Sequence, residues 1–340
     1  MYKEKIYKYT SLSSITILII SSLFSLLVGL GLYGYGMDYY GAYSKGFEWN
    51  DVRVEFFTYL GFRIATLTIF GFHIGVYITT FILSLSTGFL MREHMKSKQS
   101  YSLIIFLILF LITIHTWPVI MSTSNAMRQG LAMSFIFLTL ISSSRKNYYW
   151  MIFFSIFAIL NHKTGFLLAM IIIFASILDK LFTTFSHKAK VIINFLIGII
   201  LLFITYYSIK NFILPENFKP SRIIAGDFRG AFVFIAFIYV VFSIFYKGIL
   251  DNSFNLSLYY FGFISLGLLM NGLNWQYERL GMMMIIPYIL SLGVIFNRPS
   301  YKLYLVLTFL LLFLLTIYTG MYTEGLFYPD NIFIYSIINS

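Results

Sequence analysis

Apolar stretches of membrane length recur along the whole chain, and they constrain its fold more than any other feature. An α-helix needs roughly 20 apolar residues to cross a bilayer, where no water can bind free backbone groups. Stretches that approach or exceed this length lie near residues 11–33, 72–90, 101–121, 124–143, 148–161, 164–179, 191–209, 230–246, 255–272, 276–296 and 302–320. The sequence therefore predicts an all-α, polytopic integral membrane protein with about 11 transmembrane helices, within a range of 10 to 12.

The composition agrees with lipid as the main solvent. Only 11% of the 340 residues are charged and 59% are hydrophobic, whereas about 25% of a soluble domain is charged. Because no internal repeat or soluble domain boundary is visible, we expect residues 1–340 to form a single integral membrane domain. The absence of cysteine excludes disulfides and cysteine-based metal sites.

The charges of the loops predict how the chain is oriented. With a cytoplasmic N-terminus, the inside segments hold 14 Lys and Arg against 4 acids, and the outside segments hold 10 against 9. An excess of Lys and Arg marks the cytoplasmic side. This orientation also accounts for nearly all of the net charge of +11, so no nucleic acid partner is expected.

Two outside segments, 34–71 and 208–229, are long, so we expect the chemistry at the outer face of the membrane. Within the first of them, residues 56–70 are apolar but are interrupted by Arg63. An apolar segment of this kind is typical of a re-entrant or interfacial helix rather than a span.

The first candidate site is the hydroxyl-rich sequence Ser-Thr-Ser-Asn-Ala-Met-Arg-Gln over residues 122–129. We expect this turn to open the fourth span, with Ser124 or Asn125 as the helix cap and Arg128 one turn inside. The free N–H groups of the helix start would add to the guanidinium charge and form an outward-facing anion site. The alternative is that Arg128 only extends to the outer headgroups.

The second candidate site is Asn161-His162-Lys163, between apolar arms of about 14 and 16 residues. Such arms reach roughly 21 to 24 Å, less than a hydrocarbon core of ~30 Å. We therefore expect the tip of this hairpin to lie below the outer surface, where His162 and Lys163 need water or an anionic partner. In the alternative, the bilayer is thinned and a backbone carbonyl binds His162.

A third candidate site, residues 274–279, opens the tenth span with Arg279 in its first turn. Arg128 and Arg279, each near the start of a helix that opens toward the outer face, would then bind one polyanion from two sides. The alternative is a local ion pair of Arg279 with Glu278.

The fourth candidate site is the first outer segment, where tyrosines such as Tyr39 and Tyr40 accompany Asp38 and Glu55. Aromatic faces stack on sugar rings and carboxylates accept hydroxyl protons, although the aromatics alone also fit an interfacial belt. In the second outer segment, Arg222 and Arg229 flank Asp227 in a basic loop that fits either a phosphate contact or simple solvation.

Two further histidines, His73 and His115, lie in apolar stretches and are expected to be satisfied core residues rather than ligands.

The order of several short motifs resembles a known family. The motifs are Gly36-Met-Asp38-Tyr-Tyr, Glu55-Phe-Phe, Arg128-Gln-Gly-Leu-Ala, Asn161-His162-Lys, Tyr277-Glu-Arg279 and the aromatic tail near Tyr328-Pro329. The chain resembles EpsG-like members of the Wzy type of polysaccharide polymerase, which joins repeat units of O-antigen, capsule or exopolysaccharide. The family tends to have a proline after the glutamate that matches Glu55, and this chain has phenylalanine there.

The resemblance implies a GT-C-like, metal-independent and inverting glycosyltransferase without a cofactor. It would join undecaprenyl-diphosphate-linked oligosaccharides at the outer face of the bacterial cytoplasmic membrane, with a chain-length regulator protein as a candidate partner. The implied roles follow. The diphosphate would be bound by Arg128, Arg279, Lys163 and Gln129, the sugars by Tyr39, Tyr40, Tyr277, Arg63, Arg222 and Arg229, and the base would be His162, Asp38 or Glu55.

Three other functions fit parts of the same pattern: a flippase or transporter of the same glycolipid, a glycan ligase, and a membrane O-acyltransferase. Transporters usually carry intramembrane acids or inverted repeats, and neither is visible here. Acyl donors come from the cytoplasm, and residues 11–33 lack the charged His or Arg expected near that face. No D-x-D motif is present either, which argues against nucleotide-sugar chemistry with a carboxylate-bound metal.

Overall fold

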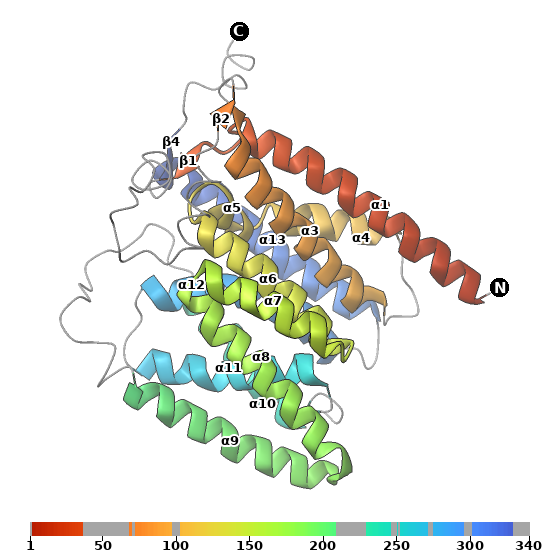
Figure 1. Ribbon diagram of the computed structural model, residues 1–340, viewed down its shortest axis with the longest axis vertical. Coiled ribbons are helices and arrows are strands. Elements are labelled where there is room, and N and C mark those ends of the chain that lie inside the picture. The colour runs from red at the N-terminus through yellow and green to blue at the C-terminus, as the bar shows by residue number, and fades with distance from the viewer. Residues whose placement is uncertain are drawn as a thin grey trace. The chain divides into compact units, whose positions relative to one another are not determined.

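The computed structural model describes residues 2–36, 68–69, 72–96, 103–208, 229–245, 250, 252–270, 275–295 and 301–328, and this part of the chain is almost entirely helical. Its α-helices are α1 (Tyr2–Gly29), α3 (Ile74–Lys96), α4 (Leu103–Ile114), α5 (Trp117–Ser124), α6 (Met127–Ser144), α7 (Tyr148–Asn161), α8 (Lys163–Leu181), α9 (His187–Ser208), α10 (Arg229–Phe245), α11 (Ser253–Met270), α12 (Trp275–Ile295) and α13 (Tyr301–Leu326) (Figure 1). The short strands are β1 (Tyr35–Gly36), β2 (Thr68–Ile69), β3 (Phe72–His73) and β4 (Phe327–Tyr328), and a 3₁₀ turn covers Phe182–Thr184. The all-α prediction is confirmed.

Every predicted apolar stretch contains a helix, and five helices are long and apolar enough to cross a membrane. These five are Leu12–Gly29, Ile74–Met95, Thr164–Thr184, His187–Ser208 and Ser253–Met270. The pair α4 and α5 would make a sixth, and four other apolar helices are shorter. The chain is thus a membrane protein, while the number of 11 crossings and the GT-C-like fold stay predictions.

The stretch 101–121 is not one straight helix, because α4 and α5 are bent by 56° at His115 and Thr116. Pro118 is the second residue of α5, where a missing N–H is tolerated. The same ring would clash with a carbonyl four residues earlier if α4 continued through it. The hydroxyl of Thr316 in α13 donates to the carbonyl of Ile112 next to this bend, at 3.3 Å.

Two local predictions are corrected by the structure. Residues 68–69, the end of the predicted re-entrant helix 56–70, form strand β2, which pairs antiparallel with β3. Residues 56–67 lie outside the described part of the chain. Residues 122–124 are not a turn before the fourth span, because α5 continues through Ser124.

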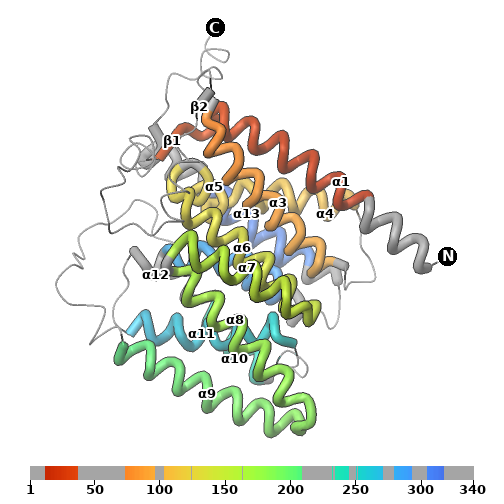
Figure 2. The backbone as a smooth tube through the Cα atoms, viewed as in Figure 1, coloured from red at the N-terminus to blue at the C-terminus, as the bar shows by residue number. Residues whose placement is uncertain are grey.

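The chain divides into two compact units, residues 1–138, 154–166 and 309–340 in the first and residues 139–153 and 167–308 in the second. The boundaries fall inside four helices, α6, α7, α8 and α13 (Figure 2). The single domain over residues 1–340 stays a prediction.

In the first unit, α1 and α3 pack closely through small residues. Along α1, the contacting pairs are Ser14 with Arg92, Ile17 with Gly88, and Ser21 with Ser84. A Cβ on Gly88 would lie 2.7 Å from the Cγ2 of Ile17, so only glycine allows this approach. Small residues of this kind are typical of helix pairs in membranes. Because the residue numbers rise on α1 as they fall on α3, the two helices are antiparallel.

In the second unit, hydroxyl groups and glycines join the helices. Ser143 lies 2.7 Å from the Oγ of Ser176 and donates to the Oγ of Ser253 at 2.8 Å, which links α6, α8 and α11. A Cβ on Gly267 would lie 2.6 Å from the carbonyl oxygen of Leu202, so α9 and α11 cross almost in backbone contact.

Candidate functional site

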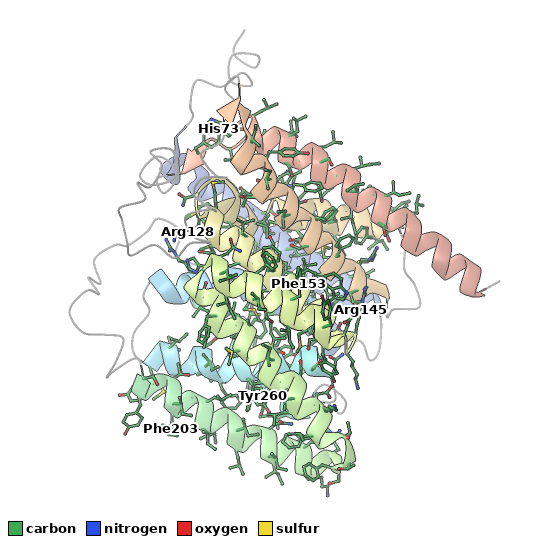
Figure 3. The ribbon with its side chains drawn as sticks, viewed as in Figure 1. His73, Arg128, Arg145, Phe153, Phe203 and Tyr260 are labelled. Atoms are coloured by element: carbon green, nitrogen blue, oxygen red, sulfur yellow. The ribbon has the colours of Figure 1, made fainter. Side chains whose placement is uncertain are left out.

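Arg128 is the second residue of α6, so it lies in the first turn rather than one turn inside as predicted. Asn125 and Ala126 separate α6 from α5, and both donate their backbone N–H to the carbonyl of Met121. Asn125 therefore caps the end of α5, and its side-chain amide contacts the sulfur of Met121 at 3.1 Å. The Arg128 side chain is half-buried and extends outward from the start of α6 (Figure 3).

The first turn of α6 is pressed against two other helices. A Cβ on Gly130 would overlap the carbonyl oxygen of Ser122 in α5 and would lie 3.3 Å from the methyl carbon of Thr79 in α3. Polar side chains around this contact are buried, with Ser122 at 0% and Gln129 at 1% exposure. Buried polar groups in lipid are costly, so their concentration at one helix start marks this place as the candidate site.

The first outer segment begins at the same place. A Cβ on Gly36 would overlap the side chain of Asn125, the residue that precedes α6 by two positions. Gly36 also pairs with Phe327, and Tyr35 pairs with Tyr328, which adds the end of α13 to this region. Three segments that are far apart in the sequence therefore meet here (Figure 1).

Besides its pairing with Tyr328, the Tyr35 side chain makes a hydrogen bond and a ring contact. Its hydroxyl donates to the carbonyl of Gly29 at 3.0 Å, and its ring lies 4.2 Å from the ring of His73. The backbone of Gly34 has a φ of 76°, which favours glycine at this turn. This turn directs the chain from α1 into β1.

His162 is the single residue between α7 and α8, and its ring binds the first turn of α8. The backbone N–H of Thr164 donates to Nδ1 at 3.2 Å, and the Thr164 hydroxyl lies 2.6 Å from the same nitrogen. A side chain that accepts the N–H two residues later is an N-cap. The predicted alternative, a backbone carbonyl as partner, is not the contact that the structure shows for Nδ1.

The hairpin of α7 and α8 lies beside the Arg128 end of α6. A Cβ on Gly165 would overlap the carbonyl oxygen of Ala158 in α7 and would lie 3.4 Å from the Cβ of Ala132 in α6. Gly165 follows His162 by three residues, and Ala132 follows Arg128 by four. The structure thus brings the His162 and Arg128 segments to the same end of the first unit.

The two arms of the α7–α8 hairpin differ in length. The 14 residues of α7 span about 21 Å. The helix begins with Tyr148, Tyr149 and Trp150, which are 38%, 71% and 44% exposed and form an aromatic girdle of the kind found at a membrane interface. The second arm, α8, has 19 residues instead of the predicted 16, and Thr164–Thr184 is long and apolar enough to cross a membrane. Only one arm is therefore as short as predicted, and the position of the hairpin tip below the outer surface stays a prediction.

In the second unit, the structure places two of the predicted arginines at one end. Arg229 is the first residue of α10 and Arg279 is the fifth of α12. A Cβ on Gly281 would lie 2.9 Å from the ring of Phe232, so the first turn of α10 packs against the second turn of α12. Tyr277 lies in the same turn of α12 as Arg279, and Arg279 is half-buried.

Several predicted site residues fall outside the described part of the chain: Asp38, Tyr39, Tyr40, Glu55, Arg63 and Arg222. Lys163 is placed as the first residue of α8. Among the described residues, no three His, Asp or Glu side chains form a group that could hold a metal ion.

Sequence reasoning missed the role of three glycines, Gly36, Gly130 and Gly165. Gly36 and Gly130 lie inside motifs that had been singled out for their charged or polar residues, and Gly165 lies two residues after Asn161-His162-Lys163. Each of the three glycines also allows a contact that a Cβ would block. Their position in or beside the motifs was the signal, since a glycine beside functional residues commonly marks a close approach of two segments.

Comparison with known proteins adds one finding. A model of the EpsG family matches residues 10–336, which includes all described motifs of the candidate site. No curated protein and no solved structure matches the chain.

Proposed function

Since the chain belongs to the EpsG family, we propose that it is a polysaccharide polymerase of the bacterial cytoplasmic membrane. In this proposal it joins undecaprenyl-diphosphate-linked oligosaccharide repeat units at the outer face. The observation that carries the proposal is the meeting of the Gly36, Arg128 and His162 segments with the end of α13 at one end of the first unit. These are the segments whose order in the sequence resembles the Wzy-type enzymes.

The proposed reaction is a single displacement. A hydroxyl at the non-reducing end of the acceptor attacks C1 at the reducing end of the donor chain. The new C–O bond forms as the bond from C1 to the diphosphate oxygen breaks, and undecaprenyl diphosphate leaves with that electron pair. The hydroxyl proton passes to a protein base, and the anomeric centre is inverted. No metal is required by this scheme.

Arg128 is proposed to stabilise the charge that grows on the leaving diphosphate. A guanidinium binds phosphate oxygens through two parallel N–H bonds, and the first turn of α6 adds backbone N–H groups with a partial positive charge. Preorganised charge of this kind is usually the largest single contribution to catalysis. Gln129 and Lys163 would hold further oxygens of the diphosphate or of the first sugar.

Arg279 in the second unit is proposed to bind a diphosphate as well. Two lipid-linked chains take part in each reaction, and each carries a diphosphate. Arg229 at the start of α10 and Tyr277 in the first turn of α12 are proposed to contact sugars. The same role is proposed for Tyr39, Tyr40, Arg63 and Arg222. A chain-length regulator protein is the proposed protein partner, at the outer face.

We propose that the base that receives the hydroxyl proton is one of three residues, His162, Asp38 or Glu55. A base contributes when its lone pair reaches the proton that it abstracts, within hydrogen-bond distance. The two carboxylates belong to the first outer segment, which begins beside Asn125.

An assay with purified protein in liposomes tests the proposal. Lipid-linked repeat units should be converted to a ladder of longer chains, and a chelator should leave the ladder unchanged. A flippase would move labelled units across the bilayer without changing their length. An O-acyltransferase would add acyl mass, and a ligase would lengthen chains only when its own acceptor is supplied. Units of unchanged length in every condition would exclude a polymerase.

A further inference from the structure

The imidazole of His162 has a fixed orientation that decides what the ring can do. The Thr164 N–H donates to Nδ1 at 3.2 Å. A backbone N–H can only donate, so Nδ1 must carry the lone pair. In the neutral ring the proton is then on Nε2, because one nitrogen is the donor when the other is the acceptor. The Thr164 hydroxyl, 2.6 Å from Nδ1, rotates to donate to the same lone pair.

We propose that His162 acts as a hydrogen-bond donor, through Nε2–H, to an oxygen of the departing lipid diphosphate, and that it is not the base. This inference rests on the proposed function, because it assigns a role within the glycan transfer described above. It leaves the acceptor proton to Asp38 or Glu55.

The geometry argues against His162 as a base. A base needs a lone pair directed at the attacking hydroxyl. The lone pair of His162 is directed at its own helix, and turning the ring over would remove the acceptor of the Thr164 N–H. Uptake of a proton would also place a positive ring at the start of α8, where the helix dipole disfavours positive charge. A neutral histidine at a helix N-terminus is instead suited to donate to a developing negative charge.

The surroundings of His162 favour an anionic oxygen as the acceptor. Lys163 is the next residue, and the N-terminal end of α8 carries partial positive charge. Gly165 packs toward Ala132, which follows Arg128 by four residues in α6.

The proton balance follows from this assignment. The acceptor hydroxyl loses its proton to the carboxylate of Asp38 or Glu55. The diphosphate leaves with the electron pair of the broken bond, while Nε2 keeps its proton and only shares it in a hydrogen bond. His162 therefore ends the reaction in the form in which it began.

Three substitutions separate a donor from a base. In His162→Asn, the side-chain oxygen can replace Nδ1 as the acceptor for Thr164, but nothing reaches the place of Nε2. In His162→Gln, an amide N–H₂ reaches that place. His162→Ala removes both groups. Neither amide takes up a proton, so rescue by glutamine cannot come from base catalysis.

We expect His162→Gln to keep turnover within about tenfold of the unchanged protein. His162→Asn and His162→Ala should lose about 10²- to 10³-fold in turnover, as when one donor to a developing oxyanion is removed. If glutamine loses as much as alanine, the donor role is wrong. If asparagine keeps full turnover, His162 only caps α8, which also overturns the proposal.

A spectroscopic measurement makes the test independent of these variants. With ¹⁵N-labelled histidine rings, His162 should show a protonated Nε2 and an unprotonated Nδ1 at neutral pH, with its signals identified by their loss in His162→Gln. His115 provides the internal reference, because its Nδ1 lies 2.7 Å from the carbonyl oxygen of Leu111 and must donate to it. A protonated Nδ1 on His162 would contradict the assignment.

The same experiments distinguish this inference from the proposed function. If the unchanged protein forms no glycan linkage, the proposed function is wrong. The diphosphate is then also excluded as the acceptor of the hydrogen bond from His162 Nε2–H. If linkages form but the ¹⁵N spectrum shows Nδ1–H, only the assignment of His162 fails. Thr164→Val, which keeps the backbone N–H and removes the hydroxyl, should leave the Nε2–H form of His162 in place.

Discussion

Gly130, in the first turn of α6, lies so close to the carbonyl oxygen of Ser122 in α5 that a Cβ on Gly130 would overlap that oxygen. The contact fixes where α6 begins, and with it the position of Arg128. The neighbouring residue Gln129 is almost fully buried, at 1% exposure. The proposed binding of a diphosphate depends on this contact, because it requires Arg128 at a defined place.

Gly130→Ala should therefore disturb the site more than the fold. The added Cβ would overlap the backbone carbonyl of Ser122, which cannot rotate away as a side chain can, so α6 must shift. An overpacked contact of this kind lowers the free energy of unfolding by about 1 to 3 kcal/mol. A shift of about 1 Å at a catalytic group lowers turnover about 10²-fold. Ser134→Ala, one turn further along α6, removes only a bond to the carbonyl of Gly130 and is the control for both the thermal unfolding and the elongation assays.

Arg128→Lys should not rescue Arg128→Ala. Lysine keeps the charge but lacks the planar pair of N–H groups that binds two phosphate oxygens at once. We expect turnover to fall at least about 10²-fold in both variants, measured as undecaprenyl diphosphate released per minute. Arg145→Ala, just beyond the other end of the same helix, should keep normal turnover (Figure 3). Normal turnover in Arg128→Ala would remove this arginine from the mechanism.

Arg279→Ala should stop chain elongation while the protein still inserts into the membrane. In the proposal, Arg279 binds the diphosphate of a lipid-linked chain, and an arginine that binds phosphate in two parallel bonds has no substitute nearby in α12. Chain-length distributions on gels check this. Chains of normal length from a variant present at normal abundance would show that Arg279 has no part in the reaction.

Gly165→Ala should separate the two arms of the His162 hairpin. The new Cβ overlaps the carbonyl oxygen of Ala158, so the first turn of α8 has to move away from α7. We expect loss of turnover and a changed ¹⁵N spectrum of His162. The neighbouring Phe166 is 53% exposed, so Phe166→Ala should change neither. An unchanged His162 spectrum in Gly165→Ala would show that the hairpin does not depend on this close approach.

Ser143→Ala should lower stability without affecting catalysis. It removes two buried bonds to Ser176 and Ser253, and such bonds between membrane helices average about 0.6 kcal/mol each. Thermal unfolding in detergent should show a loss of about 1 kcal/mol. Ser144→Ala is the control, because the Ser144 hydroxyl bonds only within its own helix in the described contacts. An equal loss of stability in both variants would show that the hydrogen bonds of Ser143 with Ser176 and Ser253 do not stabilise the protein.

The positions of the helices could be predicted from the sequence because apolar length alone decides what can cross a bilayer. The prediction 148–161 agrees with α7 at both ends, and 124–143 agrees with α6 to within three residues. The bend at His115 was not predicted, because the stretch 101–121 is apolar on both sides of Pro118. Hydropathy alone does not distinguish a proline that ends one helix and begins the next from any other residue of an apolar stretch.

The candidate site could be predicted in its parts but not in its assembly. Arg128 and His162 stood out as costly groups in an apolar chain, which composition reveals. Their placement at one end of the first unit depends on backbone contacts of Gly130 and Gly165, and hydropathy carries no information about such contacts. The orientation of the His162 ring depends on Thr164, a residue with no special signal in the sequence.

A single-turnover experiment on purified protein in liposomes tests the central claim most directly. One lipid-linked donor and one acceptor are supplied, and undecaprenyl diphosphate and the new linkage are counted together. The account predicts one undecaprenyl diphosphate released for every linkage formed, with both lost in Arg128→Ala. Linkages without matching lipid release, or release that continues in Arg128→Ala, would contradict it.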